Sequence, residues 1–292
     1  MKIKYIALAI VLLVSFKGFS QEEANQEEKS NIQTYTPSKL LSKGQWDIKW
    51  GNNLYTQTES ANSNGDVKSD GGRSNFFTST VEVFTGISEN SRFNIGAIVE
   101  FRSNTIGGRQ ALSVFSFEDT NTDRKGITSI APAVKFQPFK NISNLSVQSA
   151  IHIPLVDVEQ DTNGVFLDQA SWIFQNRFFY DYTFENGKWQ LFTELNTEYS
   201  FGEEGKSYAN NTYLLAPSVF MSYFPSNKST VLGFVQHSQR FGDFTQDYTA
   251  LGFGGKYQLT DQLNIEALYS NFVRGTDNGL GQSFNLGLRV LF

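Results

Sequence analysis

Fourteen ionisable side chains recur at alternate positions of the chain, where they could form a charged lining. Seven are acids and seven are bases, so the set is electrically balanced. Buried charges are tolerated only when they are paired, which makes a hydrogen-bonded network one possible role for them. The set is Asp47, Lys49, Glu82, Glu100, Arg102, Lys135, Arg177, Asp181, Glu194, Glu198, Lys256, Glu266, Arg274 and Arg289.

Two other groups resemble reactive sites but lack the spacing that the chemistry requires. His237 and Ser238 resemble the His/Ser region of outer-membrane phospholipase A, yet adjacent residues of a strand point to opposite faces, so the base cannot reach the nucleophile. Asp119, Asn121 and Asp123 have calcium-like spacing, but position 130 is Ile rather than the bidentate Glu of an EF-hand. We therefore assign no catalytic residue, no metal ligand and no cofactor.

The elements that must position these residues are strands, because apolar and polar residues alternate with a period of two from Gly44 onward. The clearest runs cover 46–54, 93–101, 145–155, 172–182, 189–201, 263–273 and 284–292. Weaker runs cover 73–87, 126–138, 211–224, 229–241 and 248–259. Together they predict twelve strands.

The connections between these strands alternate between short and long. Short ones are predicted at 89–90, 140–143, 186–187, 225–228 and 260–262, and longer polar ones at 58–72, 103–125, 157–169, 202–210, 242–247 and 275–281. An outer-membrane barrel has this arrangement, with short periplasmic turns and longer extracellular loops. The sequence predicts an all-β fold, a transmembrane antiparallel β-barrel of about twelve strands over residues 44–292.

The residues before the barrel divide into two predicted parts. Residues 1–20 have a basic start, an apolar run at 6–16 and small residues before Gln21, as in a cleaved secretory signal peptide. Residues 21–43 are polar and show no period, which favours a disordered periplasmic tail, with a plug or partner-binding segment as the alternative. We expect an exported protein of the Gram-negative outer membrane, in contact with the lipids of that membrane.

The composition agrees with this class and excludes others. Aromatic residues make up 15% of 292 residues, while cysteine is absent and histidine occurs twice. Without cysteine there is no disulfide framework or thiolate metal site. The net charge of −5 argues against nucleic acid as a partner, since such binding needs a basic stripe.

The C-terminal stretch from Leu251 to Phe292 resembles the last strands of an outer-membrane protein. Its hairpin, Gly255-Lys256-Tyr257-Gln258-Leu259-Thr260-Asp261, is similar to one in the family named for the meta-pathway of phenol degradation, as is Ile151-His152-Ile153-Pro154-Leu155. The resemblance implies an outer-membrane channel for small molecules. It also implies that the terminal Phe292 is the closing aromatic that barrel-assembly machinery recognises.

The balanced charges allow two interpretations. They could brace a narrow lumen, or Glu100, Arg102, Arg177, Glu194 and Glu266 could form an eyelet that selects a zwitterionic or polar solute.

Another candidate for the solute path is His152, which we place in the lumen beside Pro154 and the neighbouring-strand Pro132. A proline removes a ladder donor, so we expect a bulge or kink there. One interpretation is that the fold merely tolerates this irregularity, which then has no role in the passage of a solute. A weak seam would let an apolar solute leave sideways, and unchanged uptake after replacing both prolines with Val would exclude it.

We expect passive passage of a small solute, with apolar or aromatic solutes included. The alternative is a non-transporting barrel that is structural or binds a partner through its extracellular loops. A lipid-acting barrel enzyme is the third class, and the spacing of His237 and Ser238 disfavours it. A continuous water path would distinguish the first class from the second.

Overall fold

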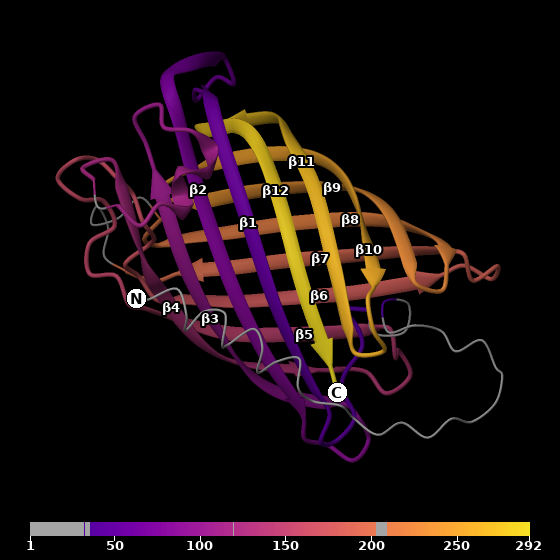
Figure 1. Cartoon of the computed structure of the whole chain (residues 1–292). Coiled ribbons are helices and arrows are strands. Elements are labelled where there is room, and N and C mark those ends of the chain that lie inside the picture. Colours follow the sequence, from indigo (N-terminus) through magenta and orange to yellow (C-terminus); the bar gives the residue numbers. More distant parts are fainter. Residues whose placement is uncertain (1–31, 33–35, 119, 203–208) are drawn as a thin grey trace, which may run out of the picture.

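A computed structural model describes residue 32 and residues 36–118, 120–202 and 209–292. Twelve antiparallel strands close into one barrel, in which each strand pairs with its sequence neighbours and β1 pairs with β12 (Figure 1). This confirms the predicted fold class. The strands are β1 Trp46–Ala61, β2 Val67–Gly86, β3 Phe93–Thr105, β4 Asp123–Phe136, β5 Leu145–Pro154, β6 Ile173–Thr183, β7 Trp189–Ser200, β8 Thr212–Ser226, β9 Ser229–Gly242, β10 Gln246–Gln258, β11 Leu263–Thr276 and β12 Asn278–Leu291.

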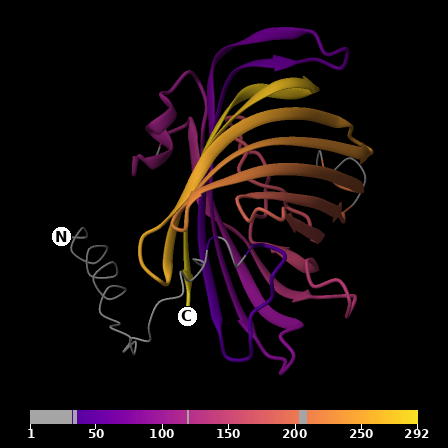
Figure 2. The same cartoon turned by 90° about the vertical axis from the view of Figure 1, so that its right-hand side faces the viewer.

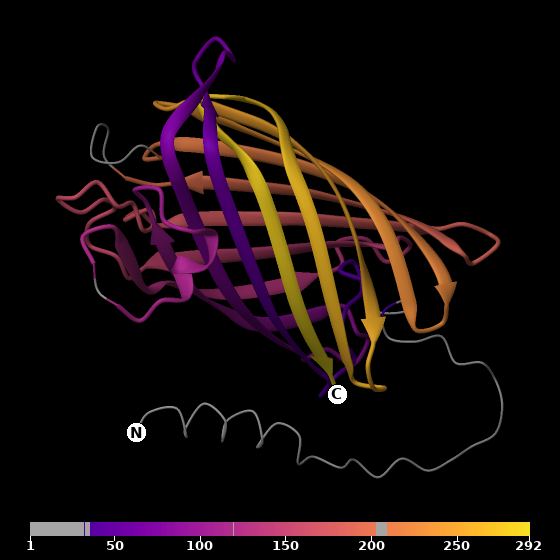
Figure 3. The same ribbon diagram turned by 45° about the horizontal axis from the view of Figure 1, so that its top comes forward.

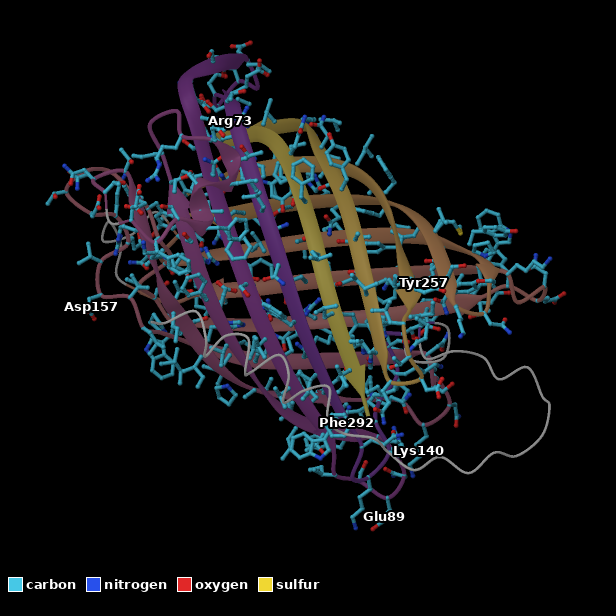
Figure 4. All side chains as sticks on the ribbon, viewed as in Figure 1. Arg73, Glu89, Lys140, Asp157, Tyr257 and Phe292 are labelled. Atoms are coloured by element: carbon cyan, nitrogen blue, oxygen red, sulfur yellow. The ribbon has the colours of Figure 1, made fainter. Side chains whose placement is uncertain are left out.

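The two ends of the barrel differ in the length of their connections. Figure 4 shows Glu89, Lys140 and Phe292 at the end that carries the short turns, and Arg73 and Asp157 at the other end. The five predicted short turns all lie at the first end, which is the periplasmic end in outer-membrane barrels.

Three of the six predicted long loops are much shorter than expected. Strands β1 and β2 continue as a hairpin beyond the barrel rim and leave only residues 62–66 between them (Figure 2). Residues 243–245 join β9 to β10, and Asp277 alone joins β11 to β12. The prediction was wrong here because it assigned these polar segments to loops. Hairpin strands that project into water need no apolar face, so polar segments can still be strands.

The pairing register explains which side chains face the lumen. Asp47, opposite Leu291, and Lys49, opposite Arg289, point inward, while Trp46 and Trp50 are 42% and 47% exposed on the outside. Because a closed sheet pairs every strand, each backbone group can be satisfied within lipid. Among the described residues, no helix is both long enough and apolar enough to cross a bilayer.

The ladder is interrupted at two prolines. Pairing between β4 and β5 stops after Ile130↔Ile153 and resumes at Ala133↔Ala150, so Pro132 lies in a gap. A second gap surrounds Pro217, between β8 and β9. The register is the same on both sides of each gap, so at the gap itself the proline only removes bonds. The expected irregularity lies close by, because the β3–β4 register shifts between Glu100 and Phe101, next to the pair Ser129↔Pro154. The sideways route for an apolar solute stays a prediction.

A loop covers part of the outer wall at the long-loop end. Its 3₁₀ helix η1, Ala111–Phe115, lies outside β2 and β3 (Figure 3). Phe115 packs on Phe77 with ring centroids 4.8 Å apart, and Asn75 donates to the carbonyl oxygens of Arg109 and Gln110. The loop thereby covers polar side chains that would otherwise face lipid.

Residues 36–43, here called the inner segment, lie inside the periplasmic end of the barrel. Ser38 is fully buried and Leu41 is 2% exposed, in a cluster with Phe84, Ile98 and Ala131. The expectation of a disordered tail is therefore wrong for these residues. The predicted signal peptide, residues 1–20, lies outside the described part of the chain.

Candidate functional site

A chain of ion pairs crosses the lumen nearer the short turns. Arg289 of β12 holds Asp47 of β1 through two bonds of 2.7 Å. Lys49 lies 3.7 Å from both Asp47 and Glu82. We call this the charge network, and its members are Asp47, Lys49, Glu82, Arg177, Glu194 and Arg289.

Arg177 carries the network from one wall of the barrel to another. Its Nε donates to Glu194 of β7 at 2.7 Å, and its Nη1 lies 3.3 Å from Glu82 of β2. Strands β2 and β6 are separated in the sheet by β3, β4 and β5, so the Arg177–Glu82 contact spans the interior. On the β2–β5 side of this contact the lumen is filled by apolar side chains, including Leu41, Phe84 and Ile98. The open space therefore lies on the other side.

The register places all six candidate residues for the solute path on the lumen face, but they do not form one ring. Glu100 and Arg102 are paired at 2.6 Å, and Arg102 also reaches Asp168 at 3.1 Å, nearer the long loops. Glu266 pairs with Lys256 at 2.7 Å on a separate wall. His152 lies 3.4 Å from Gln175. A single eyelet of the predicted residues is therefore not what the structure shows, and their part in a solute path stays a prediction.

Arg274 is the exception among the fourteen ionisable residues. A bulge in the β10–β11 pairing between Thr249 and Ala250 places Arg274 opposite Thr249, on the outer face. Its side chain is 66% exposed and lies 3.8 Å from Asp247. Because one extra residue reverses the face of every side chain beyond it, simple alternation fails at this point.

The loop between β5 and β6, residues 155–172, folds into the opposite mouth of the barrel and is here called the mouth loop. Asn104 donates to the carbonyl oxygens of Phe166 and Leu167, and Ser200 bonds Gln169 across the mouth at 3.2 Å. Burial raises the pKa of the Asp168 carboxyl, and Arg102 opposes that rise. The mouth loop narrows this entrance.

Arg124 is the main anchor of the mouth loop, because its guanidinium donates to three loop carbonyls. They belong to Val158 at 2.9 Å, Glu159 at 2.8 Å and Val165 at 3.3 Å. We expect Arg124→Met to raise the rate of proteolysis within residues 155–172 by roughly tenfold, since bonds to a charged donor contribute about 1.5–3 kcal/mol. Limited proteolysis in detergent measures this rate. Arg92→Met, at a short turn, is the control, and equal cleavage of both variants would contradict the assignment.

The inner segment closes the periplasmic end through polar bonds to the wall. Thr36 donates to the Asp181 carboxylate at 2.9 Å. The ammonium of Lys135 donates to the backbone carbonyls of Pro37 and Lys39. Further along, Gly44 bonds Gly86. Among the described residues no carboxylate forms an ion pair with Lys135, and this buried lysine obtains its acceptors from the inner segment.

Beside the inner segment the lumen contains a cavity of about 310 Å³, lined by strands β1, β2 and β6–β12. Thr36 and Pro37 line its floor. Charged and aromatic side chains line its walls: Lys49, Glu82, Arg177, Glu194, Lys256, Glu266 and Arg289, with Phe179, Phe192, Phe220 and Phe224. The four phenylalanines are here called the phenyl wall. The cavity is thus both charged and aromatic, as small-molecule sites with a few polar groups on an apolar lining are.

Several of these parts have little signal in the sequence. Asp168 lies in a predicted loop, and Thr36 in a predicted tail, so neither was a candidate. The alternation did place Phe192 and Phe220 on the same face as the charged residues, which sets them apart from the lipid-facing rings. Aromatic residues at lumen positions are the signal that could have identified the phenyl wall.

His237 and Ser238 are arranged as their spacing predicted. His237 lies on the outer face, 3.0 Å from the Thr249 hydroxyl, and Ser238 faces the lumen. Asp123 accepts from the backbone and hydroxyl of Thr120 at 2.7 and 2.9 Å, whereas Asp119 lies outside the described residues.

Comparison with solved structures supports the outer-membrane fold. The crystal structure of the COG4313 outer membrane channel from Pseudomonas putida F1 has a TM-score of 0.68 and 10% identity, and covers 92% of this chain and 100% of that one. The beta domain of the Bordetella autotransporter BrkA has a TM-score of 0.54 and 11% identity, over 84% and 98%. No curated protein sequence matches the chain.

The sequence itself matches a family model over most of the barrel. The match covers residues 91–290, from the start of β3 to the end of β12, and its description is "Putative MetA-pathway of phenol degradation". This confirms the resemblance seen in the β10–β11 hairpin and at Ile151–Leu155. The chain is an outer-membrane β-barrel and belongs to the family of the MetA-pathway of phenol degradation.

Proposed function

We propose that the barrel lets a small solute cross the outer membrane passively through its lumen. The observation that supports this best is the cavity of about 310 Å³, whose floor is formed by the inner segment. Polar bonds to its backbone hold the mouth loop, and the inner segment adds the apolar packing of Leu41 to its own polar bonds. A solute could pass when the mouth loop opens and the inner segment moves aside, and no energy source or cofactor is needed.

A non-transporting barrel and a hydrolase have less support. A barrel that works only through its loops does not need a cavity with charged and aromatic walls. Its whole lumen could be filled with apolar side chains, as it is on the side of β2 to β5. A His–Ser hydrolase needs both groups on one face, and here His237 and Ser238 lie on opposite faces.

Conductance in planar bilayers tests the proposal. Refolded protein should give small, discrete current steps, because the Arg177–Glu82 contact and the inner segment restrict the lumen. Heat-modifiable mobility on a gel confirms folding independently. Folded protein that stays silent, and that also gives no uptake of small sugars or aromatics into proteoliposomes, would overturn it.

The C-terminal residue also supports a proposal about assembly. Phe292 closes the seam of the barrel, since its N–H donates to Trp46 at 3.0 Å and its carbonyl accepts from Trp46 at 2.7 Å, while its side chain is 54% exposed. Such a ring is available to barrel-assembly machinery. We expect Phe292→Ser to reduce the amount of folded barrel in the outer membrane several-fold, with refolding of the purified chain unchanged. Impaired refolding in vitro would instead assign Phe292 a purely structural role.

A further inference from the structure

We propose that the lumen cavity binds a small aromatic solute that carries a carboxylate, with the ring against the phenyl wall and the carboxylate at Lys49. The inference rests on the proposed function and specifies the solute class. It follows from three properties of the cavity: the arrangement of its walls, the pairing of its cations and the space beside Lys49.

The phenyl pair Phe192–Phe220 and Lys49 lie on opposite sides of the cavity, whereas Arg177 lies beside the phenyl wall, 5.0 Å from the Phe179 ring. Phe192 and Phe220 belong to β7 and β8, and their rings are 5.5 Å apart. Lys49 belongs to β1, which is six strands away from β7 in the closed ring of twelve. A molecule that spans the cavity therefore meets phenyl rings at one side and an ammonium at the other. Phenyl rings favour offset or edge contacts with another ring, beyond the effect of burial.

Lys49 is the cation of the cavity that is available to an incoming anion. Arg177, Lys256 and Arg289 each have a carboxylate oxygen at 2.7 Å. Lys49, by contrast, lies 3.7 Å from Asp47 and 3.7 Å from Glu82, and Arg289 and Arg177 already hold these two carboxylates. The side chain of Lys49 is 29% exposed. With Asp47 included, these four cations face four carboxylates, but Arg177 engages two of them, so no carboxylate is held by Lys49 alone.

The wall beside Lys49 is bare, which leaves room for the solute. Gly51 follows two positions along β1 on the same face, and a Cβ at Gly51 would have no atom within 4 Å. Its partner across β1 and β12 is Gly287, so two adjacent lumen positions lack side chains. The cavity volume of about 310 Å³ suits a solute of one ring better than a larger one.

Equilibrium dialysis of the purified full-length protein tests this site, with benzoate, benzylamine, benzyl alcohol and acetate as probes. Benzoate should bind, and each of the other three should bind at least about tenfold more weakly, because each lacks the ring or the negative charge. Lys49→Met should weaken benzoate binding by about tenfold and leave benzyl alcohol unchanged. Gly51→Phe, which fills the recess without a strained backbone, should weaken both. Lys140→Met removes the same charge at an exposed turn and should change neither.

The outcomes separate this inference from the proposed function. Equal binding of benzoate and benzylamine, or unchanged benzoate affinity in folded Lys49→Met, would overturn the inference, while current steps in bilayers would still support a channel. Benzoate binding to a protein that passes no solute would support the site and contradict the channel. Heat-modifiable mobility confirms the folding of each variant.

Discussion

Arg177→Met is expected to lower the free energy of unfolding by about 3 kcal/mol, because it leaves Glu194 without the cation that holds it and Glu82 with Lys49 alone, 3.7 Å away. Arg177 holds Glu194 at 2.7 Å and Glu82 at 3.3 Å, and the three side chains are only 27%, 16% and 15% exposed. Removing one partner of a buried pair costs more than the pair itself contributes, since the remaining charge keeps its desolvation penalty. Urea-induced unfolding in detergent or lipid vesicles measures the difference.

The matched control replaces the charges together. The triple variant Arg177→Met, Glu82→Gln, Glu194→Gln removes the uncompensated charges and should regain most of the lost stability. Lys228→Met at an exposed turn should have no effect. If Arg177→Met alone were as stable as the wild type, water would already screen these groups, and the charge network would not brace the barrel.

Deletion of residues 21–41 is expected to raise single-channel conductance several-fold, because it removes the floor of the cavity. Thr36 and Pro37 line the cavity, and Leu40 and Leu41 are 8% and 2% exposed against the wall. The deletion keeps Gly44 and its bond to Gly86, so the start of β1 is preserved. Planar-bilayer recordings of the two proteins under the same salt give the comparison.

A shorter deletion, residues 21–31, keeps the inner segment and is the control for loss of chain length. It should conduct like the full-length protein. If the 21–41 deletion conducted no more than this control while remaining folded, the restriction would lie elsewhere, for example at the Arg177–Glu82 contact, and the inner segment would not be the closure.

The fold was predictable because alternation with a period of two fixes the face of each side chain without knowledge of its neighbours. Thirteen of the fourteen ionisable positions follow this rule, and Arg274 fails it because a bulge inserts one residue. Contacts across the lumen were not predictable. The Arg177–Glu82 contact depends on the distance between β2 and β6, which closure of the barrel sets and local sequence does not encode.

The inner segment shows a second reason why the structure could not be predicted fully from the sequence. Residues 36–43 are polar and aperiodic, as a disordered tail would be, yet Thr36, Ser38, Leu40 and Leu41 are buried, and the carbonyls of Pro37 and Lys39 accept from Lys135. A buried lysine at an inward strand position was visible in the sequence. Its acceptors were not, since backbone carbonyls belong to every residue and carry no compositional signal.

If ions and solutes cross the membrane through the cavity, chemical modification of a single cysteine in its wall should obstruct them. Thr80 faces the lumen and lines the cavity, and the chain has no cysteine, so Thr80→Cys is the one thiol present. Adding a charged methanethiosulfonate reagent during bilayer recording should reduce the current in discrete steps. An undiminished current, with modification of the cysteine confirmed by mass, would contradict passage through the cavity.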